Sequence, residues 1–323
     1  MTQREPNLAA PLVGSLRDLE FRLGVKRAEV NELLKSRSSI YQPFQRPKKQ
    51  HPYPGRLRRL DASKPIKYRR IDNPVKQLKD IQKRILERIL DHVNLPSYMF
   101  GAVAGKTLVS HAEEHIKNQA STLVRMDISS YYPNVTCHHV YFVWHVVLGC
   151  PPPVAKLLTE LTTFDWHLPQ GAPTSPAIAN ILLASIYAPV CLASERAGLT
   201  ITTWVDDLIF SGLAAREVME TVRATLAANG FKVALEKREI LGPKAEKLTT
   251  GVRIGRFAAR APHRKMSELR AAIHRLAVGG VDPVEVEKYR QNLAARIAHI
   301  ATIHKGDAAR LKRQAAISQV FLK

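Results

Sequence analysis

The sequence predicts an α+β protein, with an antiparallel sheet in the middle of the chain and helices over much of the rest. Three observations support this fold class. β-branched and apolar residues lie on both sides of the acidic pair Asp206-Asp207, which is the pattern of a β-hairpin. The run Thr122–Ile128 is typical of a second strand, and its acidic residue Asp127 lies at the end. Apolar residues recur at helical spacing before and after this central region.

The charge of the chain indicates a polyanionic partner. The chain has 323 residues, a length that allows one large domain or two to three lobes. Its hydrophobic content of 45% is that of a globular protein. Lys and Arg number 49 against 28 Asp and Glu, a net charge of +21. Nucleic acid and an acidic membrane surface both fit such a charge. The basic residues are spread along the chain instead of forming one amphipathic helix, which favours nucleic acid.

Cysteine spacing and hydropathy predict a cytoplasmic protein that does not span a membrane. The cysteines have no zinc-site or disulfide-framework spacing, so we expect reduced thiols; they are Cys137, Cys150 and Cys191. The N-terminus lacks the apolar core of a signal peptide. The longest apolar stretch, Ala177–Ala193, is interrupted by polar residues and Pro189, which indicates a buried helix.

The first third of the chain predicts a helix, a basic segment and a second helix. After a frayed start at 1–13, apolar spacing predicts a helix over about 16–34. Residues 36–70 are basic and irregular with interleaved aromatic rings, which is typical of a nucleic-acid surface; a solvated basic loop is the alternative. The basic residues are Arg46, Lys48, Lys49, Arg56, Arg58, Arg59, Lys64, Lys67, Arg69 and Arg70. Pro74 is expected to open a helix, whose apolar stripe is Val75, Leu78, Ile81, Ile85, Ile89 and Leu90.

A short helix carrying His111 and His115 is expected next. Two His residues four positions apart can share a metal ion, but Ala112 stands where a zincin-type motif needs Glu. No third ligand is evident, so packing or hydrogen bonding is the alternative that we favour for both rings.

The remaining elements are predicted from apolar runs and turn residues. Ser129–Asn134 is expected to turn the chain, with Thr136 capping an apolar helix over 140–148. Tyr131 is expected to be core and Tyr132 to face the other way, because neighbours on an extended segment face opposite ways. Gly171, in the loop 168–176, allows close backbone approach to a ligand. Further expectations are a helix over 214–228, a strand over 231–235 leading to Lys237, a strand over 248–254 and helices from about 267 onward.

The three acidic residues at strand ends predict a metal-dependent site. Two adjacent carboxylates at a hairpin tip repel each other, and a divalent cation would relieve that repulsion; a solvated Asp-Asp turn is the alternative. Asp127, Asp206 and Asp207 together could hold two Mg²⁺ ions about 3.5–4 Å apart, as in phosphoryl-transfer sites. Such chemistry requires mainly positioning and charge neutralisation, which acids, Lys and Arg provide.

These motifs resemble those of reverse transcriptases, specifically the bacterial retron-type group, over roughly residues 15–300. The most specific match is the loop Leu168–Pro176 together with Asn180. The segment Val205–Asp207 resembles the core of the family's YxDD box, and Asp127–Pro133 resembles its first palm motif.

Shorter segments extend the resemblance. Tyr68–Ile71 resembles the family's fingers segment, and Lys237 resembles the lysine that assists pyrophosphate departure. Thr250-Gly251 and the pair Ala112 and His115 resemble the VTG and NAxxH elements of retron enzymes. Trp204, His111 and Thr249 replace the family's Tyr, Asn and Val. The catalytic carboxylates are retained, so these departures concern the subfamily and not the activity.

The resemblance implies a right-hand polymerase that carries out RNA-templated DNA synthesis. It places an N-terminal helical region and fingers at 1–120, the palm at 121–255 and a helical thumb at 256–323. It makes Asp127, Asp206 and Asp207 the ligands of two Mg²⁺ ions, with Lys237 as a further catalytic residue. It implies nucleotide contacts by Arg69, Ile128, Tyr132 and Gln170, and primer or template contacts by Trp204 and Gly251.

The resemblance also implies partners. They are a structured noncoding RNA that serves as template and primer, deoxynucleotides, the DNA product and an effector protein, in anti-phage defence. Priming from an RNA 2′-hydroxyl would give an RNA–DNA hybrid. The sequence has no maturase or endonuclease extension, which favours the retron-type group over intron enzymes. A stand-alone defence or intron-derived enzyme is one alternative, and a non-catalytic RNA-binding scaffold that restrains a toxic partner is another. The retained acids, Gln170 and Lys237 argue against the scaffold.

Overall fold

The computed structural model describes residues 8, 13–36, 39–47, 66, 68–116, 122–318 and 320. The chain divides into two compact units. The first unit is Met1–Lys106 with Thr122–Ile240, and the second unit is Thr107–Ser121 with Leu241–Lys323. Both units combine helices with antiparallel strand pairs, so the predicted α+β class is confirmed.

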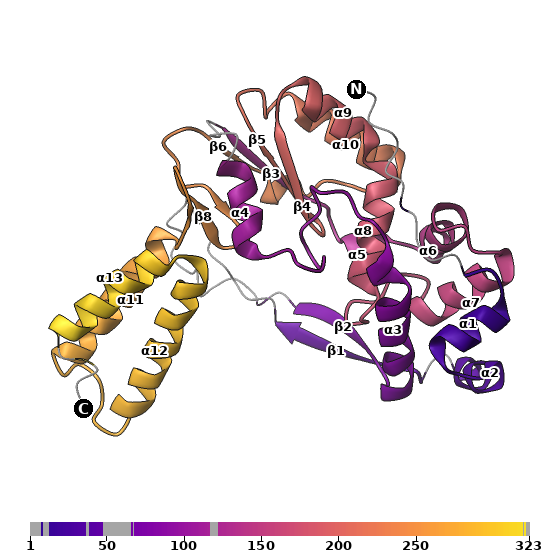
Figure 1. Ribbon diagram of the computed structural model, residues 1–323, viewed down its shortest axis with the longest axis horizontal. Helices are drawn as coiled ribbons and strands as arrows, with labels where there is room; N and C mark the ends of the chain where they lie inside the picture. Colours follow the sequence, from indigo (N-terminus) through magenta and orange to yellow (C-terminus); the bar gives the residue numbers. More distant parts are fainter. Residues whose placement is uncertain are drawn as a thin grey trace. The chain divides into compact units, whose positions relative to one another are not determined.

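The main sheet of the first unit has the strand order β4-β5-β3-β6. Its strands are β3 (Leu123–Asp127), β4 (Thr200–Trp204), β5 (Asp207–Ser211) and β6 (Glu239–Leu241). Leu208, Ile209 and Phe210 of β5 are all buried, so the strand shows a continuous apolar run and not an alternating one. Helix α9 (Ala188–Arg196) packs against β4, and α10 (Val218–Ala228) lies beside α9 (Figure 1). The predicted hairpin at 200–212 is confirmed.

A two-stranded sheet corrects the prediction for residues 36–70. Strand β1 (Tyr41–Pro47) pairs antiparallel with β2 (Tyr68–Pro74), where an irregular basic segment was expected. Six of the seven β1 residues are exposed, so no apolar alternation marks this strand in the sequence. Pro74 ends β2 and does not open a helix; α3 (Lys76–Arg88) follows, with Leu78, Ile81 and Ile85 buried as predicted. The basic residues at 48–64 and Lys67 lie outside the described residues.

Two predicted helices are each divided in the structure. The helix expected over 16–34 is α1 (Leu16–Leu23) followed by α2 (Arg27–Lys35), because Gly24 takes the left-handed conformation and ends α1. The apolar stretch 177–193 forms α8 (Ser175–Ile186) and α9, bent by 61°. Pro189 in the first turn of α9 prevents a continuous helix, because proline lacks the donor and clashes with the preceding turn.

No single helix within the described ranges is long and apolar enough to cross a membrane. The remaining elements of the first unit are short helices and turns. They are η1 (Leu90–His92), α5 (Tyr131–Asn134), α6 (Cys137–Phe142), the π-helix η2 (Val143–Val147), α7 (Pro152–Thr162) and η3 (Leu235–Lys237). Thr136 caps α6 as predicted. The strand expected over 231–235 is wrong: Val233 makes only an isolated bridge to Ile128, and a 3₁₀ turn carries Lys237.

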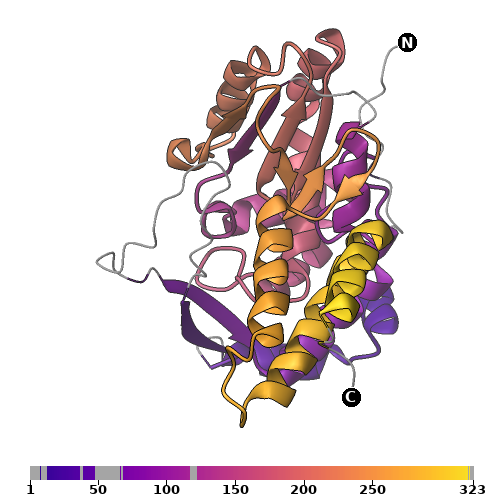
Figure 2. The same ribbon diagram turned by 90° about the vertical axis from the view of Figure 1, so that its left-hand side faces the viewer.

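The described residues of the second unit form a small sheet and four helices. Helix α4 (Leu108–Ile116) packs against β7 (Leu248–Thr249), β8 (Val252–Ile254) and β9 (Ala259–Arg260). The single strand expected over 248–254 is therefore a hairpin, turned at Thr250-Gly251. Helices α11 (His263–Ala277), α12 (Val286–Ile303) and α13 (Lys305–Ile317) lie side by side (orange to yellow in Figure 2). Helix α12 buries Leu293, Ile297 and Ile300, which recur at helical spacing.

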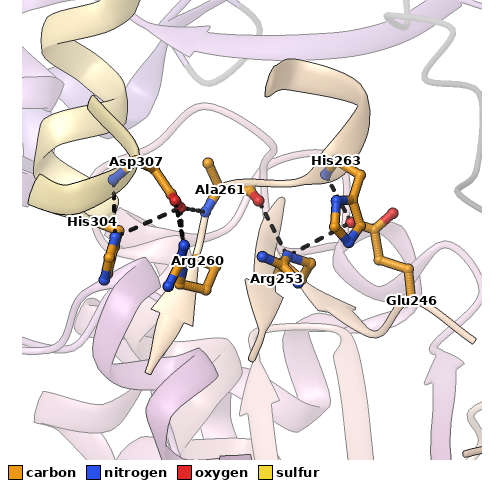
Figure 3. Close-up of polar contacts among 7 residues, drawn as sticks. All are labelled: Glu246, Arg253, Arg260, Ala261, His263, His304 and Asp307. Atoms are coloured by element: carbon orange, nitrogen blue, oxygen red, sulfur yellow. Dashed lines mark hydrogen bonds and ion pairs between the residues drawn. The ribbon is translucent and has the colours of Figure 1, made fainter. Parts of the chain in front are cut away.

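A buried ion pair fixes the first turn of α13 to β9 (Figure 3). Asp307 accepts hydrogen bonds from the Arg260 guanidinium at 2.6 and 3.0 Å and from the main-chain nitrogen of Ala261 at 3.1 Å. The backbone nitrogen of Asp307 donates to His304, the residue that caps the helix. The carboxylate is therefore paired and hydrogen-bonded, as a buried charge must be.

Candidate active site

Asp127 and Asp207 face each other across the pair β3–β5. Asp127 is the last residue of β3, Asp207 is the first residue of β5, and the two are register partners. Asp206 lies in the turn between β4 and β5, and its carbonyl accepts a 3.0 Å hydrogen bond from the nitrogen of Ile128. The three acidic residues therefore lie at one end of the same sheet.

Lys237 contacts Asp127 from a separate segment of the chain. Its Nζ atom lies 2.7 Å from Oδ1 of Asp127. The segment before it runs along the end of β3, where Ala234 donates to the Asp127 carbonyl at 2.8 Å and Ser129 donates to the Lys232 carbonyl at 2.7 Å. These main-chain bonds hold the lysine near the acids although the segment is not the strand predicted.

Arg125 is a site residue that sequence reasoning missed. Its Nε atom lies 3.3 Å from Oδ1 of Asp207, and its Nη1 atom lies 3.5 Å from Oε2 of Glu239. All three side chains are mostly buried. Arg125 lies two positions before Asp127 on the same strand, and alternate strand residues share a face. That spacing was the available signal for a cation beside the acids.

Burial and mutual repulsion raise the pKa values of two carboxyls. Burial raises the pKa of Asp206, and the charge of Asp127 raises it further. Burial raises the pKa of Asp207 to about 7, with Asp127, Asp206 and Glu239 acting in the same direction and Arg125 opposing them. Added positive charge would therefore favour the ionised form of both groups.

The donor chemistry of this site fits a hard divalent cation. Three carboxylates at one sheet end are the oxygen donors that Mg²⁺ prefers, and repulsion among them favours a cation. Across the part of the chain that the structure describes, no group of three or more His, Cys, Asp or Glu side chains is arranged to hold a metal ion. Lys237 contacts Asp127, and Arg125 contacts Asp207. The two-ion site therefore stays a prediction.

Tyr131 is core and Tyr132 is partly exposed; burial raises the pKa of both hydroxyls, and Asp206 acts in the same direction. Both are on the short helix α5, so the extended segment predicted here is wrong. Tyr131 is 1% exposed, and its hydroxyl donates to the Ala179 carbonyl at 2.8 Å. Tyr132 is partly exposed; burial raises its pKa, Asp206 adds to the rise and Arg69 opposes it. Tyr132, Asp206 and Arg69 are therefore electrostatic neighbours.

The loop 168–176 is joined to strand β2, which carries Arg69. The nitrogen of Asp72 donates to the Gln170 carbonyl at 2.7 Å. A side chain at Gly171 would meet the Asp72 carbonyl oxygen at 3.0 Å, so the close neighbour of this glycine is the β2 backbone. Asp72 is buried and pairs with Arg70 at 2.7 Å. Adjacent strand residues face opposite ways, so Arg69 lies on the other face of β2 from Arg70.

Of the remaining predicted residues, Trp204 lies beside the acids and Gly251 lies in the second unit. Trp204 is the register partner of Asp207 in the β4–β5 hairpin and is partly exposed. Gly251 lies in the β7–β8 turn of the second unit. His111 and His115 are buried on α4, and Nδ1 of His111 lies 3.4 Å from Oγ1 of Thr250. The two retron-like elements of the sequence thus contact each other.

Comparisons with known proteins give a family match. The family described as reverse transcriptase (RNA-dependent DNA polymerase) matches residues 47–254, well over half of the chain. Retron Ec86 reverse transcriptase of Escherichia coli is 25% identical over 287 residues, covering 88% of this chain and 85% of the relative. Retron Se72 reverse transcriptase of Salmonella heidelberg is 28% identical over 207 residues, covering 64% of this chain and 50% of the relative. Retron Mx65 reverse transcriptase of Myxococcus xanthus is 28% identical over 263 residues, covering 75% of this chain and 60% of the relative. The chain thus spans half to three-fifths of the last two relatives.

Solved structures of two telomerases are also similar. Telomerase from Candida albicans, in complex with a fragment of telomeric RNA, matches with a TM-score of 0.45 and 8% identity, covering 77% of this chain and 55% of that one. Apo telomerase from Candida tropicalis matches with a TM-score of 0.43 and 11% identity, covering 61% and 53%.

Proposed function

Because the chain belongs to the reverse transcriptase (RNA-dependent DNA polymerase) family and to its bacterial retron-type group, we propose that it copies a dedicated structured RNA into DNA at the site formed by Asp127, Asp206 and Asp207. RNA-directed DNA synthesis is the activity of this family. The observation that carries the proposed site is the pairing of Asp127 with Asp207 across β3–β5, with Lys237 2.7 Å from Asp127.

The chemistry proposed for the site is phosphoryl transfer assisted by fixed charges. Asp127, Asp206 and Asp207 would hold two Mg²⁺ ions, which supply activation of the attacking hydroxyl and neutralisation of phosphate charge when bound. Lys237 supplies a cation near the acids for the charge that develops as pyrophosphate leaves. Arg125 balances the charges of Asp207 and Glu239 and so holds the side chain of Asp207 in place.

Nucleotide binding is assigned to residues around the acids. Arg69, an exposed cation on β2, would bind the triphosphate. The Tyr132 ring would pack under the deoxyribose and exclude a 2′-hydroxyl. Ile128 and Gln170 complete the site through positions fixed by the backbone bonds to Asp206 and Asp72. Trp204 and Gly251 are proposed as primer or template contacts.

The proposed partners follow from charge and from the relatives. A net charge of +21 supports binding of a nucleic acid. The relatives named retron reverse transcriptases support a structured noncoding RNA as template and primer. We propose an RNA–DNA hybrid as product, an effector protein as a further partner, a role in anti-phage defence and a cytoplasmic location. Free thiols at the three cysteines agree with that compartment.

The experiment that tests this function is isolation of the protein from its host, followed by sequencing of the nucleic acid that it carries. We expect one RNA species joined to DNA complementary to part of it. The Asp206→Asn variant should carry the same RNA without DNA. A bound RNA that never yields DNA would support the non-catalytic scaffold instead. DNA made from many unrelated RNAs would support a stand-alone or intron-derived enzyme.

A further inference from the structure

The turn that carries Asp206 has an unfavourable backbone conformation. Val205, the residue before it, has φ +58°, in the left-handed region that β-branched residues rarely adopt. Such a conformation persists only where surrounding contacts determine it. The position of Asp206 therefore depends on contacts outside the β4–β5 hairpin.

The segment Tyr98–Gly101 supplies those contacts. The nitrogen of Phe100 donates to the Thr203 carbonyl at 2.9 Å, and the nitrogen of Thr203 donates to the Tyr98 carbonyl at 2.9 Å. These bonds pair the segment with the end of β4 and bring Gly101 against the turn. A Cβ atom at Gly101 would lie 2.7 Å from the nitrogen of Val205 and 2.9 Å from the carbonyl carbon of Trp204. Backbone atoms cannot move aside as a flexible side chain does, so this approach requires glycine.

Asn180 of helix α8 fixes Gly101 from the other side. Its Nδ2 group donates to the Gly101 carbonyl at 2.7 Å, and its side chain is fully buried. Its Oδ1 atom is buried and has no hydrogen-bond partner among the residues that the structure describes. An unpaired buried acceptor is costly, and an apolar side chain of similar size would avoid that cost. The bond to Gly101 is therefore what the amide contributes.

We propose that Asn180 and Gly101 are positioning residues for the catalytic turn. Asn180 fixes the backbone of Gly101, Gly101 packs against Val205, and Val205 holds Asp206 at the end of the sheet opposite Ile128. The Asn180–Gly101 contact thereby joins a helix of the first unit to the β4–β5 hairpin (α8 and β4 are labelled in Figure 1). This proposal rests on the proposed function, because it concerns the geometry of the same site.

The test uses three variants of the full chain in primer extension on an RNA template. Asn180→Asp keeps the shape of the side chain but replaces the donor by an acceptor that faces a carbonyl. Asn180→Leu removes the amide, and Gly101→Ala adds a Cβ atom that would displace the backbone at Val205. Because a displacement near 1 Å at a reacting group costs about 100-fold, we expect each variant to lower the single-turnover rate by about that factor. The affinity for deoxynucleotide should fall less than the rate, because the proposed triphosphate contact, Arg69, lies on β2 and not in the turn.

A second readout does not depend on activity. Hydrogen–deuterium exchange of the peptide spanning 200–211 should rise in all three variants, because the turn loses its support. Gln82→Leu is the matched control: Gln82 is a fully buried amide that donates to the Leu161 carbonyl at 2.9 Å. Gly14→Ala is the control for Gly101→Ala, because a Cβ atom at Gly14 meets nothing within 4 Å. Neither control should change exchange over 200–211 or the rate per folded molecule.

The outcomes separate this proposal from the proposed function. A wild-type protein that makes no DNA on any RNA template contradicts the function, and exchange over 200–211 then still tests the contact. Wild-type rates per folded molecule in Asn180→Asp and Gly101→Ala would overturn the positioning role. The positioning role would also be overturned if the activity of these variants fell only in proportion to their loss of folded protein, as is expected for Gln82→Leu. If Asn180→Leu does not fold, Asn180→Asp and Gly101→Ala decide the matter.

Discussion

The Nζ atom of Lys237 lies 2.7 Å from Oδ1 of Asp127, although the two residues are 110 positions apart. Main-chain bonds from Ala234 to Asp127 and from Ser129 to Lys232 hold the two segments together. The lysine therefore does not reach the acid by side-chain flexibility alone. A cation fixed at this place can balance charge that changes during phosphoryl transfer.

Lys237→Ala should lower the rate of the chemical step more than it weakens binding of primer–template. The reason is that the ammonium group acts on developing charge and not on the nucleic acid as a whole. Loss of one such group costs about 10²–10³-fold in rate. The measurement is single-turnover extension with saturating RNA template and deoxynucleotide.

Arg69→Ala is the comparison for that measurement, because Arg69 is proposed to bind the triphosphate in the ground state. It should raise the deoxynucleotide concentration needed for half-maximal rate and change the maximal rate less. Unchanged single-turnover kinetics in both Lys237→Ala and Arg69→Ala would show that neither cation faces the nucleotide.

Tyr132→Ala should admit ribonucleotides while deoxyribonucleotides are still used. A ring under the sugar rejects the 2′-hydroxyl sterically, so its removal relaxes discrimination without adding an attraction. The measurement is the ratio of kcat/KM for the two sugar types on one RNA template. An active variant with the wild-type ratio would place the sugar discrimination elsewhere.

Tyr131→Ala serves as the structural control for that substitution. Tyr131 is buried, packs edge-on against Phe231 at 5.3 Å and donates to Ala179. Its loss should lower the free energy of unfolding by about 3–5 kcal/mol. The sugar ratio of the protein that remains folded should not change.

The contribution of His115 to stability should fall as the pH is lowered from 7 to 5. Burial lowers the pKa of His115 to about 3, and His111 acts in the same direction. The unfolded chain, with an ordinary histidine pKa near 6.5, binds the proton first, so this contribution is lost as pH falls through that range. For this one group the loss between pH 7 and pH 5 is about 2 kcal/mol.

The His115→Leu variant isolates this contribution from the carboxyls, whose raised pKa values act in the opposite direction. Urea unfolding at pH 7 and pH 5 gives the change in the free energy of unfolding, which should be about 2 kcal/mol more favourable in the variant than in wild type. An equal change in both proteins would mean that His115 is protonated in the folded state at pH 5.

RNA affinity should fall steeply with salt. The net charge of +21 indicates many phosphate contacts, and each releases condensed counterions. For roughly 6–10 contacts, affinity should drop by about 10³–10⁵ between 50 and 200 mM salt. Filter binding of the RNA isolated with the protein measures the slope. A flat dependence would contradict recognition based on charge.

Local patterns of the sequence predicted several elements, including the hairpin that carries Asp206 and Asp207. The stripe in α3 and the β4–β5 hairpin follow from apolar spacing and β-branched flanks, which act over a few residues. Tyr131 was predicted as core, but for the wrong reason. An extended segment was expected here, whereas both tyrosines lie on α5.

Features that depend on long-range contacts were not predictable in this way. Strand β1 has no apolar alternation, and only its pairing with β2 makes it a strand. The roles of Gly101 and Asn180 depend on a contact between residues 79 positions apart. Lys237 was placed by its motif, but the segment that carries it is a 3₁₀ turn held by main-chain bonds and not a strand.

The central claim is that the acids at the end of the β3–β5 pair perform DNA synthesis. Single-turnover primer extension on an RNA template, comparing wild type with Asp206→Asn, tests it most directly. Because a ligand for the cations is removed, the variant should lose about 1,000-fold or more in rate, several kcal/mol of transition-state stabilisation. RNA affinity and melting temperature should stay at wild-type values, and Asp91→Asn, at an exposed acid, should extend normally. Extension by Asp206→Asn at the wild-type rate would contradict the account.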